Sequence, residues 1–176
     1  KVFALKVYEI PETGKQARGK LINNLIKLSE DEKVSTIIKV RAHDEDNREL
    51  FFITKKGIVK KTEARLFFHI NKNGIRALTL KGEDELTYVG LTSGTKKNEV
   101  FIATRAGFAI RFSQEDLRSM GRTAAGVKGI NLRKDDFVVS AAIVNPETDL
   151  DKLSVLTITD EGYGKRTSLK EYKVQT

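Results

Sequence analysis

The sequence lacks several residue types on which many functional sites depend. Among its 176 residues there is no cysteine and no tryptophan, and there are only two prolines, two histidines and one methionine. Without cysteine, disulfides and thiol chemistry are excluded, and this composition fits a reducing compartment. The missing tryptophan also argues against interaction propellers of the WD type, whose repeats carry that residue.

Long hydrophobic runs are absent as well. No apolar stretch approaches the roughly 18 residues that a membrane-spanning helix needs, and no secretory signal is visible. The apolar content of 39% and the charged content of 32% predict a soluble, folded chain, and the length predicts one domain with a proper core. Because the chain starts inside an alternating apolar segment, Lys1-Val2-Phe3-Ala4-Leu5, we expect it to be cut from a longer protein.

Catalytic and metal-binding patterns are weak. His43 and His69 have no companion ligand at metal spacing, and no histidine accompanies a candidate serine nucleophile. Acidic residues cluster at 30–32, 44–46, 83–85 and 135–136, and three of these clusters recur at one place in a repeat, so we interpret them as solvated turns. We therefore expect no catalytic residue, no metal site and no cofactor in this chain.

One short stretch, Gly164-Lys165-Arg166-Thr167, invites comparison with a phosphate-binding loop. That loop needs a glycine five residues before the Gly-Lys pair and a serine or threonine directly after the lysine. The chain has Thr159 and Arg166 at these two places. We therefore predict a β-turn here, and no nucleotide site.

A repeat of strand, turn and strand organises the chain. In each copy an apolar run ends in a threonine, a glycine follows three residues later, and a base lies four residues after the glycine. The copies are centred on the hairpins Leu50–Thr62, Asn98–Phe112 and Lys152–Ser168, at separations of 50 and 55 residues. A matched period carried by such units predicts an all-β propeller or pinwheel of four-stranded blades.

The repeat also predicts blade boundaries. We expect blades at 17–71, 72–123 and 124–176, with 1–16 as the end of a preceding blade, so that about three blades of a larger ring are present or the units form an open crescent. Further strands are expected at Lys1–Ile10, Val34–Val40, Leu86–Leu91 and Phe137–Val144. Helical signal is limited to one short turn that Ser113 would cap.

The net charge is +8, and the excess of bases lies in the first two repeats, whereas residues 124–176 are neutral. Bases that recur at fixed points of the repeat would form one stripe, which suits sequence-independent contact with phosphates. Few aromatic residues are available as a platform for single strands. The alternative is a charged face that serves solubility. The candidate DNA-binding residues are Arg18, Lys20, Lys60, Lys61, Arg65, Lys72, Arg76, Arg111, Arg118, Arg122, Lys128, Lys165 and Arg166.

Three groups of residues point to a known family. They are Val7-Tyr8-Glu9-Ile10-Pro11 with Ala17-Arg18-Gly19-Lys20 and Ile22-Asn23-Asn24-Leu25, then Met120 to Ile130, then Gly162 to Thr167. In this order they resemble the C-terminal domain of the bacterial DNA gyrase A subunit, and the topoisomerase IV homologue shares that architecture. The similarity covers the whole chain. The family's first-blade hallmark, Gln-Arg-Arg-Gly-Gly-Lys-Gly, is absent, so the resemblance places the chain from the end of the first blade through about the fourth.

The resemblance implies a six-bladed β-pinwheel in which neighbouring blades exchange strands. It also implies that duplex DNA bends around a basic outer rim in support of negative supercoiling. Its implied partners are double-stranded DNA and, in an A2B2 assembly, the remainder of the gyrase A subunit with the gyrase B subunit, in the bacterial cytoplasm and without a membrane. Cleavage and the use of ATP and Mg²⁺ would belong to other parts of that enzyme. A protein-interaction propeller without DNA binding remains the alternative.

Overall fold

The computed structural model describes residues 1–40, 47–93, 97–145 and 147–175. Three β-hairpins form its framework. β1 (Glu49–Thr54) pairs with β2 (Ile58–Glu63), β4 (Glu99–Thr104) with β5 (Ala109–Ser113), and β8 (Ser154–Ile158) with β9 (Gly164–Ser168). The repeat in the sequence thus corresponds to a repeat of hairpins, as predicted.

The threonine and the glycine of each repeat build the same turn. The hydroxyl oxygens of Thr54, Thr104 and Thr159 accept a hydrogen bond from the amide four residues later, at 3.1, 3.3 and 3.1 Å. The glycine amide three residues on donates to the threonine carbonyl in each turn. All three glycines have a φ between 77° and 85°, which residues with a Cβ rarely adopt. The spacing of threonine and glycine is therefore set by one turn geometry.

Each complete sheet has four strands that come from different repeats. The first has the order β3-β1-β2-β6, with β3 (Leu86–Leu91) and β6 (Val127–Lys128) at its edges. The second has the order β10-β5-β4-β7, with β7 (Val138–Val144) and β10 (Val174–Gln175) at its edges. Every hairpin of these two sheets therefore takes its edge strands from later parts of the chain.

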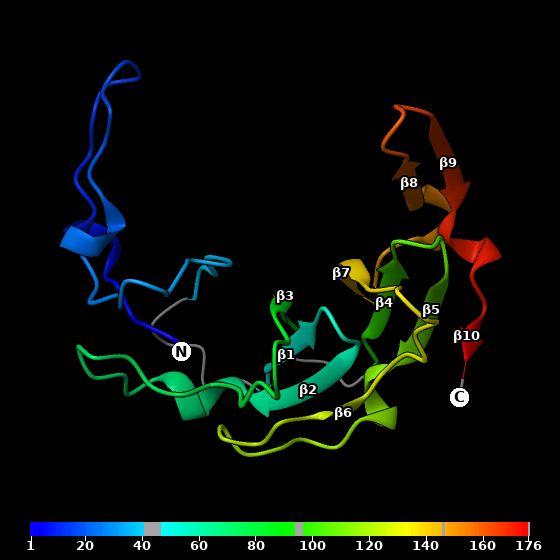
Figure 1. Cartoon of the computed structure of the whole chain (residues 1–176), viewed down its shortest axis with the longest axis horizontal. Helices are drawn as coiled ribbons and strands as arrows, with labels where there is room; N and C mark the ends of the chain where they lie inside the picture. Colours follow the sequence, from blue (N-terminus) through cyan, green and yellow to red (C-terminus); the bar gives the residue numbers. More distant parts are fainter. Residues whose placement is uncertain (41–46, 94–96, 146, 176) are drawn as a thin grey trace.

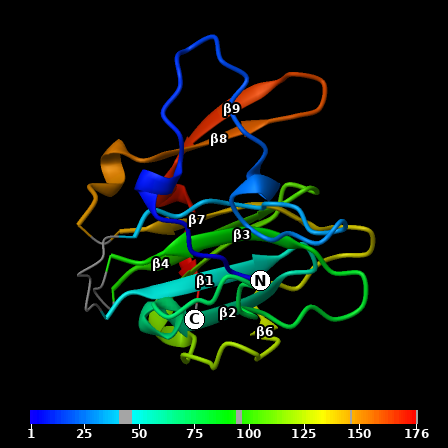
Figure 2. The same cartoon turned by 90° about the vertical axis from the view of Figure 1, so that its left-hand side faces the viewer.

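The sheets follow one another along an open arc (Figure 1). β3 and β7 lie on its concave side, and the outer edges with β6 and β10 lie on its convex side. The N-terminal arm and the β8–β9 hairpin form the two ends of the arc, and the view turned by 90° shows them rising on the same side of the sheets (Figure 2). Both connectors between repeats also lie on the convex side (Figure 1).

Helical structure in the described part of the chain consists of six short 3-10 helices. They are η1 (Val7–Glu9), η2 (Ile22–Asn24), η3 (Ala64–Phe67), η4 (Gln114–Asp116), η5 (Leu150–Lys152) and η6 (Leu169–Glu171). The predicted cap is confirmed, because the Ser113 hydroxyl accepts from the Glu115 amide. Over the same residues, no helix is long and apolar enough to cross a membrane.

The core lies between successive sheets. Its largest cluster joins Phe51, Ile53 and Val59 of the first sheet to Val100 and Ile102 of the second. Two smaller clusters cover the outer faces of the two sheets, around Phe52 and around Phe101. Because each sheet is covered on both faces, β1 is buried from Leu50 through Thr54 without alternation.

Two of the predicted strands are wrong. Val34–Val40 forms no strand, and Ile37 is 83% exposed. At the equivalent place β3 and β7 each pair with the hairpin of the preceding repeat, and no such hairpin precedes residue 34 among the described residues. Lys1–Ile10 contributes only one bridge, between Val2 and Ile75, and then the η1 turn. A β-branched run therefore becomes a strand here only where a partner is available.

Candidate nucleic-acid interface

Lys60 does not lie on the surface, where the predicted stripe of phosphate-binding bases would need it. Its side chain is 0% exposed, opposite Phe52 in β1, and Nζ lies 5.6 Å from the centroid of that ring. Nζ donates to the carbonyl oxygens of Ala77 and Arg122, at 2.5 Å each. Burial lowers the pKa of this ammonium group to about 8, because the low-polarity surroundings disfavour the charge.

Lys61 and Arg111 are also buried, at 7% and 4% exposed. Lys61 Nζ lies 3.2 Å from Glu49 Oε2, and Arg111 Nη2 lies 2.6 Å from Glu99 Oε2. In both hairpins the acid is the diagonal cross-strand neighbour of the base, a position that long side chains can reach. The prediction that these two bases belong to a phosphate-binding surface stripe is therefore wrong, because both are buried in the complete sheets.

The bases of these two pairs also donate hydrogen bonds to backbone carbonyls of the next repeat. Lys61 Nζ donates to the carbonyl oxygen of Gln114 at 3.0 Å. Arg111 Nη1 donates to the carbonyl oxygens of Leu169 and Tyr172, at 3.2 and 3.0 Å. In each case the first acceptor begins a 3-10 helix that follows the next hairpin. We call each base with its acid an inter-repeat clip, because it fixes one hairpin to the end of the next.

The third copy of this position differs. Arg166 and its neighbour Lys165 lie on β9 and are exposed. The acid that lies twelve residues before the base in the first two copies is replaced by Ser154 in the third. Arg166 therefore occupies the repeat position of Arg111 but lacks the acid of the clip, so it can serve as the matched control for Arg111.

The remaining candidate bases are mostly exposed, and six of them lie in the two connectors between repeats. Residues 64–82 carry four bases and no acid, and residues 117–134 carry five bases and no acid. Figure 1 shows both connectors on the convex side of the arc. We use the name connector rim for the six predicted bases there, of which Arg122 is half-buried and the others exposed: Arg65, Lys72, Arg76, Arg118, Arg122 and Lys128.

The connector rim is available for an external anion. Within the described residues only Arg65 of this group has a carboxylate in ion-pair range, that of Glu63, whose hydrogen bond raises the pKa of the guanidinium. An exposed pair of this kind contributes little to stability and can be replaced by another anion. The other four exposed bases and the half-buried Arg122 have no carboxylate in ion-pair range among the described residues.

Two glycines allow the second connector to pack closely against β2. A Cβ on Gly126 would lie 2.6 Å from the carbonyl oxygen of Val59, and a Cβ on Gly129 would lie 2.3 Å from Val59 Cγ1. Gly126 also has a φ of 91°. The close approach lets β6 pair with β2, with Val59 opposite Val127. Lys128, one of the rim bases of this connector, thus lies in a strand paired with β2.

Two other candidates lie away from the connector rim. Arg18 and Lys20 are exposed in the N-terminal arm, just before η2. That arm is at the end of the arc opposite the β8–β9 hairpin (Figure 1). The structure therefore does not bring all thirteen predicted bases into one stripe.

The repeated acids are not simply solvated turns. Asp84 is buried, and its Oδ1 accepts from the amides of Lys56 and Glu85, both at 2.9 Å. Asp136 Oδ1 accepts from Ala106 and Phe137 in the same way. Burial acts to raise the pKa of Asp136, but these bonds and one with Thr104 lower it overall. The acids therefore cap the preceding hairpin turn, which corrects the prediction for these two.

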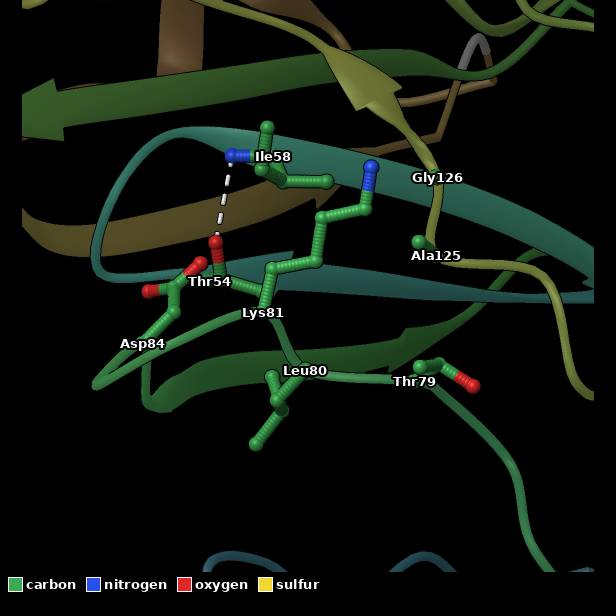
Figure 3. A pocket seen from close by; sticks show the side chains of 8 residues that line it. All are labelled: Thr54, Ile58, Thr79, Leu80, Lys81, Asp84, Ala125 and Gly126. Carbon is green, nitrogen blue, oxygen red and sulfur yellow. Dashed lines mark hydrogen bonds between the residues drawn. The ribbon is translucent and has the colours of Figure 1, made fainter.

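The structure offers little for a small ligand or a metal ion. A cavity of about 40 Å³ lies between the first hairpin turn and both connectors, lined by Thr54, Ile58, Thr79, Leu80, Lys81, Asp84, Ala125 and Gly126 (Figure 3). This volume is near that of a water molecule. No group of three potential metal ligands occurs among the described residues, and His69 is exposed. His43 and the acids at 44–46 lie outside the described residues. Gly164–Thr167 lies in β9, just after the turn, and not in the turn itself.

Sequence reasoning missed the acids of the clips and the extent of the rim. The signal for Glu49 and Glu99 is the constant spacing of twelve residues to Lys61 and Arg111. The signal for the rim is the lack of acids in both connectors. The same acid-free stretches also contain Lys81, Arg133 and Lys134. All three are exposed, and Arg133 lies over the ring of Phe108, with its guanidinium carbon 4.0 Å from the centroid.

The fold and the rim together define a propeller-like β-repeat domain with a basic convex edge. A family model described as "DNA gyrase C-terminal domain, beta-propeller" matches residues 1–41, 48–93, 98–145 and 153–176. The chain belongs to this family, as the resemblance implied.

Relatives and solved structures agree with this assignment. The chain is 44% identical to the DNA gyrase A subunit of Staphylococcus epidermidis over 99% of its length, and 42% identical to that of Lawsonia intracellularis over its full length. It spans about a fifth of these relatives, 19% and 21%. A crystal structure of the C-terminal domain of DNA topoisomerase IV matches 97% of the chain and 51% of that structure, with a TM-score of 0.84 and 32% identity. A DNA gyrase A C-terminal domain matches 91% of the chain and 50% of that structure, with a TM-score of 0.73 and 24% identity, which supports the fold.

Proposed function

We propose that this chain binds duplex DNA along the connector rim and bends it around the convex side of the arc, as part of a DNA gyrase. The observation that carries the proposal is the absence of acids from both connectors, which lie on the convex side of the arc and carry mostly exposed bases. Phosphate contacts of this kind supply affinity without reading the base sequence. The names of the relatives support the assignment to a gyrase, and the proposal extends to an assembly of A and B subunits that introduces negative supercoils.

The curvature of the arc supports bending over straight binding. Both connectors lie on the convex side of the arc, so a duplex that contacts the bases of both would follow that side (Figure 1). Bending a site of 20–30 base pairs by 40–90° costs about 1–6 kcal/mol, which additional phosphate contacts offset. Both connectors contact β2, at Lys60 and through β6, so the first sheet would set the path of the DNA between them.

No part of this proposal gives the chain a catalytic step. We propose that cleavage and ATP hydrolysis, with any ATP or Mg²⁺ that they need, belong to other parts of the enzyme. The blade boundaries at 17–71, 72–123 and 124–176 likewise stay a proposal. The hairpins support them as repeats of the sequence, although each four-stranded sheet is completed by strands from later repeats.

The test compares two variants with the same charge. One changes Lys72, Arg76, Arg118 and Lys128 of the connector rim to alanine. The control changes four exposed bases that lie outside both connectors: Lys33, Lys56, Lys97 and Arg105. The affinity for a duplex of mixed sequence is measured against salt concentration. Each phosphate contact contributes about −0.9 to the slope of log affinity against log salt.

We expect the rim variant to flatten that slope by about 3–4 units and the control by less than 1, whatever the DNA sequence. Equal losses in both variants would mean that binding reflects diffuse charge and would refute the rim. If neither variant weakens binding, the bases serve solubility, and the protein-interaction alternative gains support. DNA bending is read from energy transfer between dyes at the two duplex ends, which should fall in the rim variant alone.

A further inference from the structure

The two acid-free connectors meet at a single junction beneath the connector rim. Ala77 of the first connector and Arg122 of the second offer their carbonyl oxygens to the same buried amine, that of Lys60. Nearby, the Thr79 hydroxyl donates to the carbonyl oxygen of Thr123 at 2.7 Å. The junction consists of these two donors and their three acceptors.

The junction is adjacent in the chain to two rim bases. Arg76 directly precedes Ala77, which is buried, and Arg122 itself supplies one of the carbonyl groups. Fixing these two carbonyls therefore fixes the backbone from which both guanidinium groups extend. Because β2 carries Lys60, the connectors are also held in register with the first sheet.

A lysine at this place is not a general requirement of the fold. Fifty residues later the equivalent position of the second hairpin is Ile110, which is half-buried and packs against the main hydrophobic core. Lys60 forms no ion pair with a carboxylate among the described residues, and its hydrogen bonds go only to connector carbonyls. Burying an ammonium group is costly unless hydrogen bonds compensate for the lost water, and here two connector carbonyls accept from it.

We infer that Lys60, together with Thr79, is a positioning residue of the connector rim, which holds Arg76 and Arg122 at a fixed separation for contact with neighbouring phosphates. The inference rests on the proposed function, because it requires that the rim binds DNA. Phosphates recur at short intervals along a duplex, so a pair of guanidinium groups held at one separation meets them without further ordering. Without the hydrogen bonds of the junction, the guanidinium groups of Arg76 and Arg122 keep their charge but are no longer held at one separation.

The test uses two variants. Lys60→Met keeps an apolar side chain of similar length, and Thr79→Val removes only the hydrogen bond to the Thr123 carbonyl oxygen. The matched control is Ile110→Met at the equivalent place of the second hairpin. Folding is checked by circular dichroism and urea unfolding, and the salt slope of DNA affinity is then measured for the full chain. We expect Lys60→Met to flatten the slope by roughly 1–2 units, Thr79→Val by less than 1 unit, and the control not at all.

A double-mutant cycle separates positioning from a general loss of structure. In the wild-type chain, Arg122→Ala should remove about 0.9 from the slope, and in the Lys60→Met chain less than half of that. Lys72→Ala, which is away from the junction, should cost the same in both backgrounds. If Lys60→Met does not fold, the same cycle is run with Thr79→Val, which changes a side chain away from the buried core.

The outcomes also separate this inference from the proposed function. Folded Lys60→Met and Thr79→Val chains that keep the wild-type slope, while the rim variant loses it, would overturn the junction and leave DNA binding intact. Additive effects of Lys60→Met and Arg122→Ala would overturn it in the same way. If the rim variant itself keeps the wild-type slope, the proposed function fails.

Discussion

Replacing Arg111 by methionine tests whether the repeated base holds the fold or serves the surface. The guanidinium group is 4% exposed and makes four contacts, two with Glu99 and two with backbone carbonyls of residues that follow the third hairpin. Methionine keeps most of the apolar stem and removes every one of these contacts. Glu99 would then remain as a carboxylate without its partner.

The expected loss follows from burial. Removing one partner of a fully buried ion pair costs about 3–5 kcal/mol, because an uncompensated charge stays behind. The Glu99 side chain is 24% exposed, so water screens part of that charge and the lower end of the range applies. We expect a decrease of about 3 kcal/mol in the free energy of unfolding. For a chain of this length that is a decrease of roughly 6–12 °C in Tm.

The assay is urea unfolding followed by circular dichroism, with Arg166→Met as the matched control. Arg166 occupies the same place in the third hairpin, but it is exposed and Ser154 replaces the acid. We expect a change within about 0.5 kcal/mol there. The double variant Arg111→Met with Glu99→Leu should be more stable than Arg111→Met alone, since no unpaired charge remains. Equal stability of the Arg111→Met and Arg166→Met chains would refute the clip.

Two further predictions concern stability. Burial lowers the pKa of Lys60 in the folded chain to about 8 from 10.5, so the unfavourable charge is fully present below pH 8 and is relieved as the pH rises toward 10.5. The free energy of unfolding of Lys60→Met, taken relative to wild type, should therefore fall by up to roughly 3 kcal/mol between pH 8 and 10.5. If urea titrations from pH 7 to 10.5 give a constant difference between the two chains, the lowered pKa of Lys60 is contradicted. Gly126→Ala should lower the free energy of unfolding by about 2 kcal/mol or more, because the new Cβ would meet the Val59 carbonyl at a φ of 91°. Gly107→Ala, at a φ of 83° but in open space, should lower it by only about 1 kcal/mol. Equal losses in thermal unfolding would show that backbone strain alone matters.

The sequence alone determined the repeat, because one turn geometry requires the same residues each time. Thr54 and Gly57 build a turn whose hydrogen bonds are local, so their spacing is visible in the sequence and recurs in the other two hairpins. The all-β class follows from the same local regularity, whereas the family was identified by the resemblance of other motifs, such as Met120 to Ile130. The basic connectors were also visible there, because a lack of acids is a property of composition.

Only the tertiary structure decided which bases are exposed. Lys61, Arg111 and Arg166 occupy one position of the repeat, yet two are buried in clips and one is exposed, because burial depends on which segments pack over the strand. The same reason explains Val34–Val40, whose residues favour a strand but have no partner strand among the described residues. Local sequence sets what a segment can form, whereas contacts between repeats far apart in the chain determine whether it forms a strand and which way its charges face.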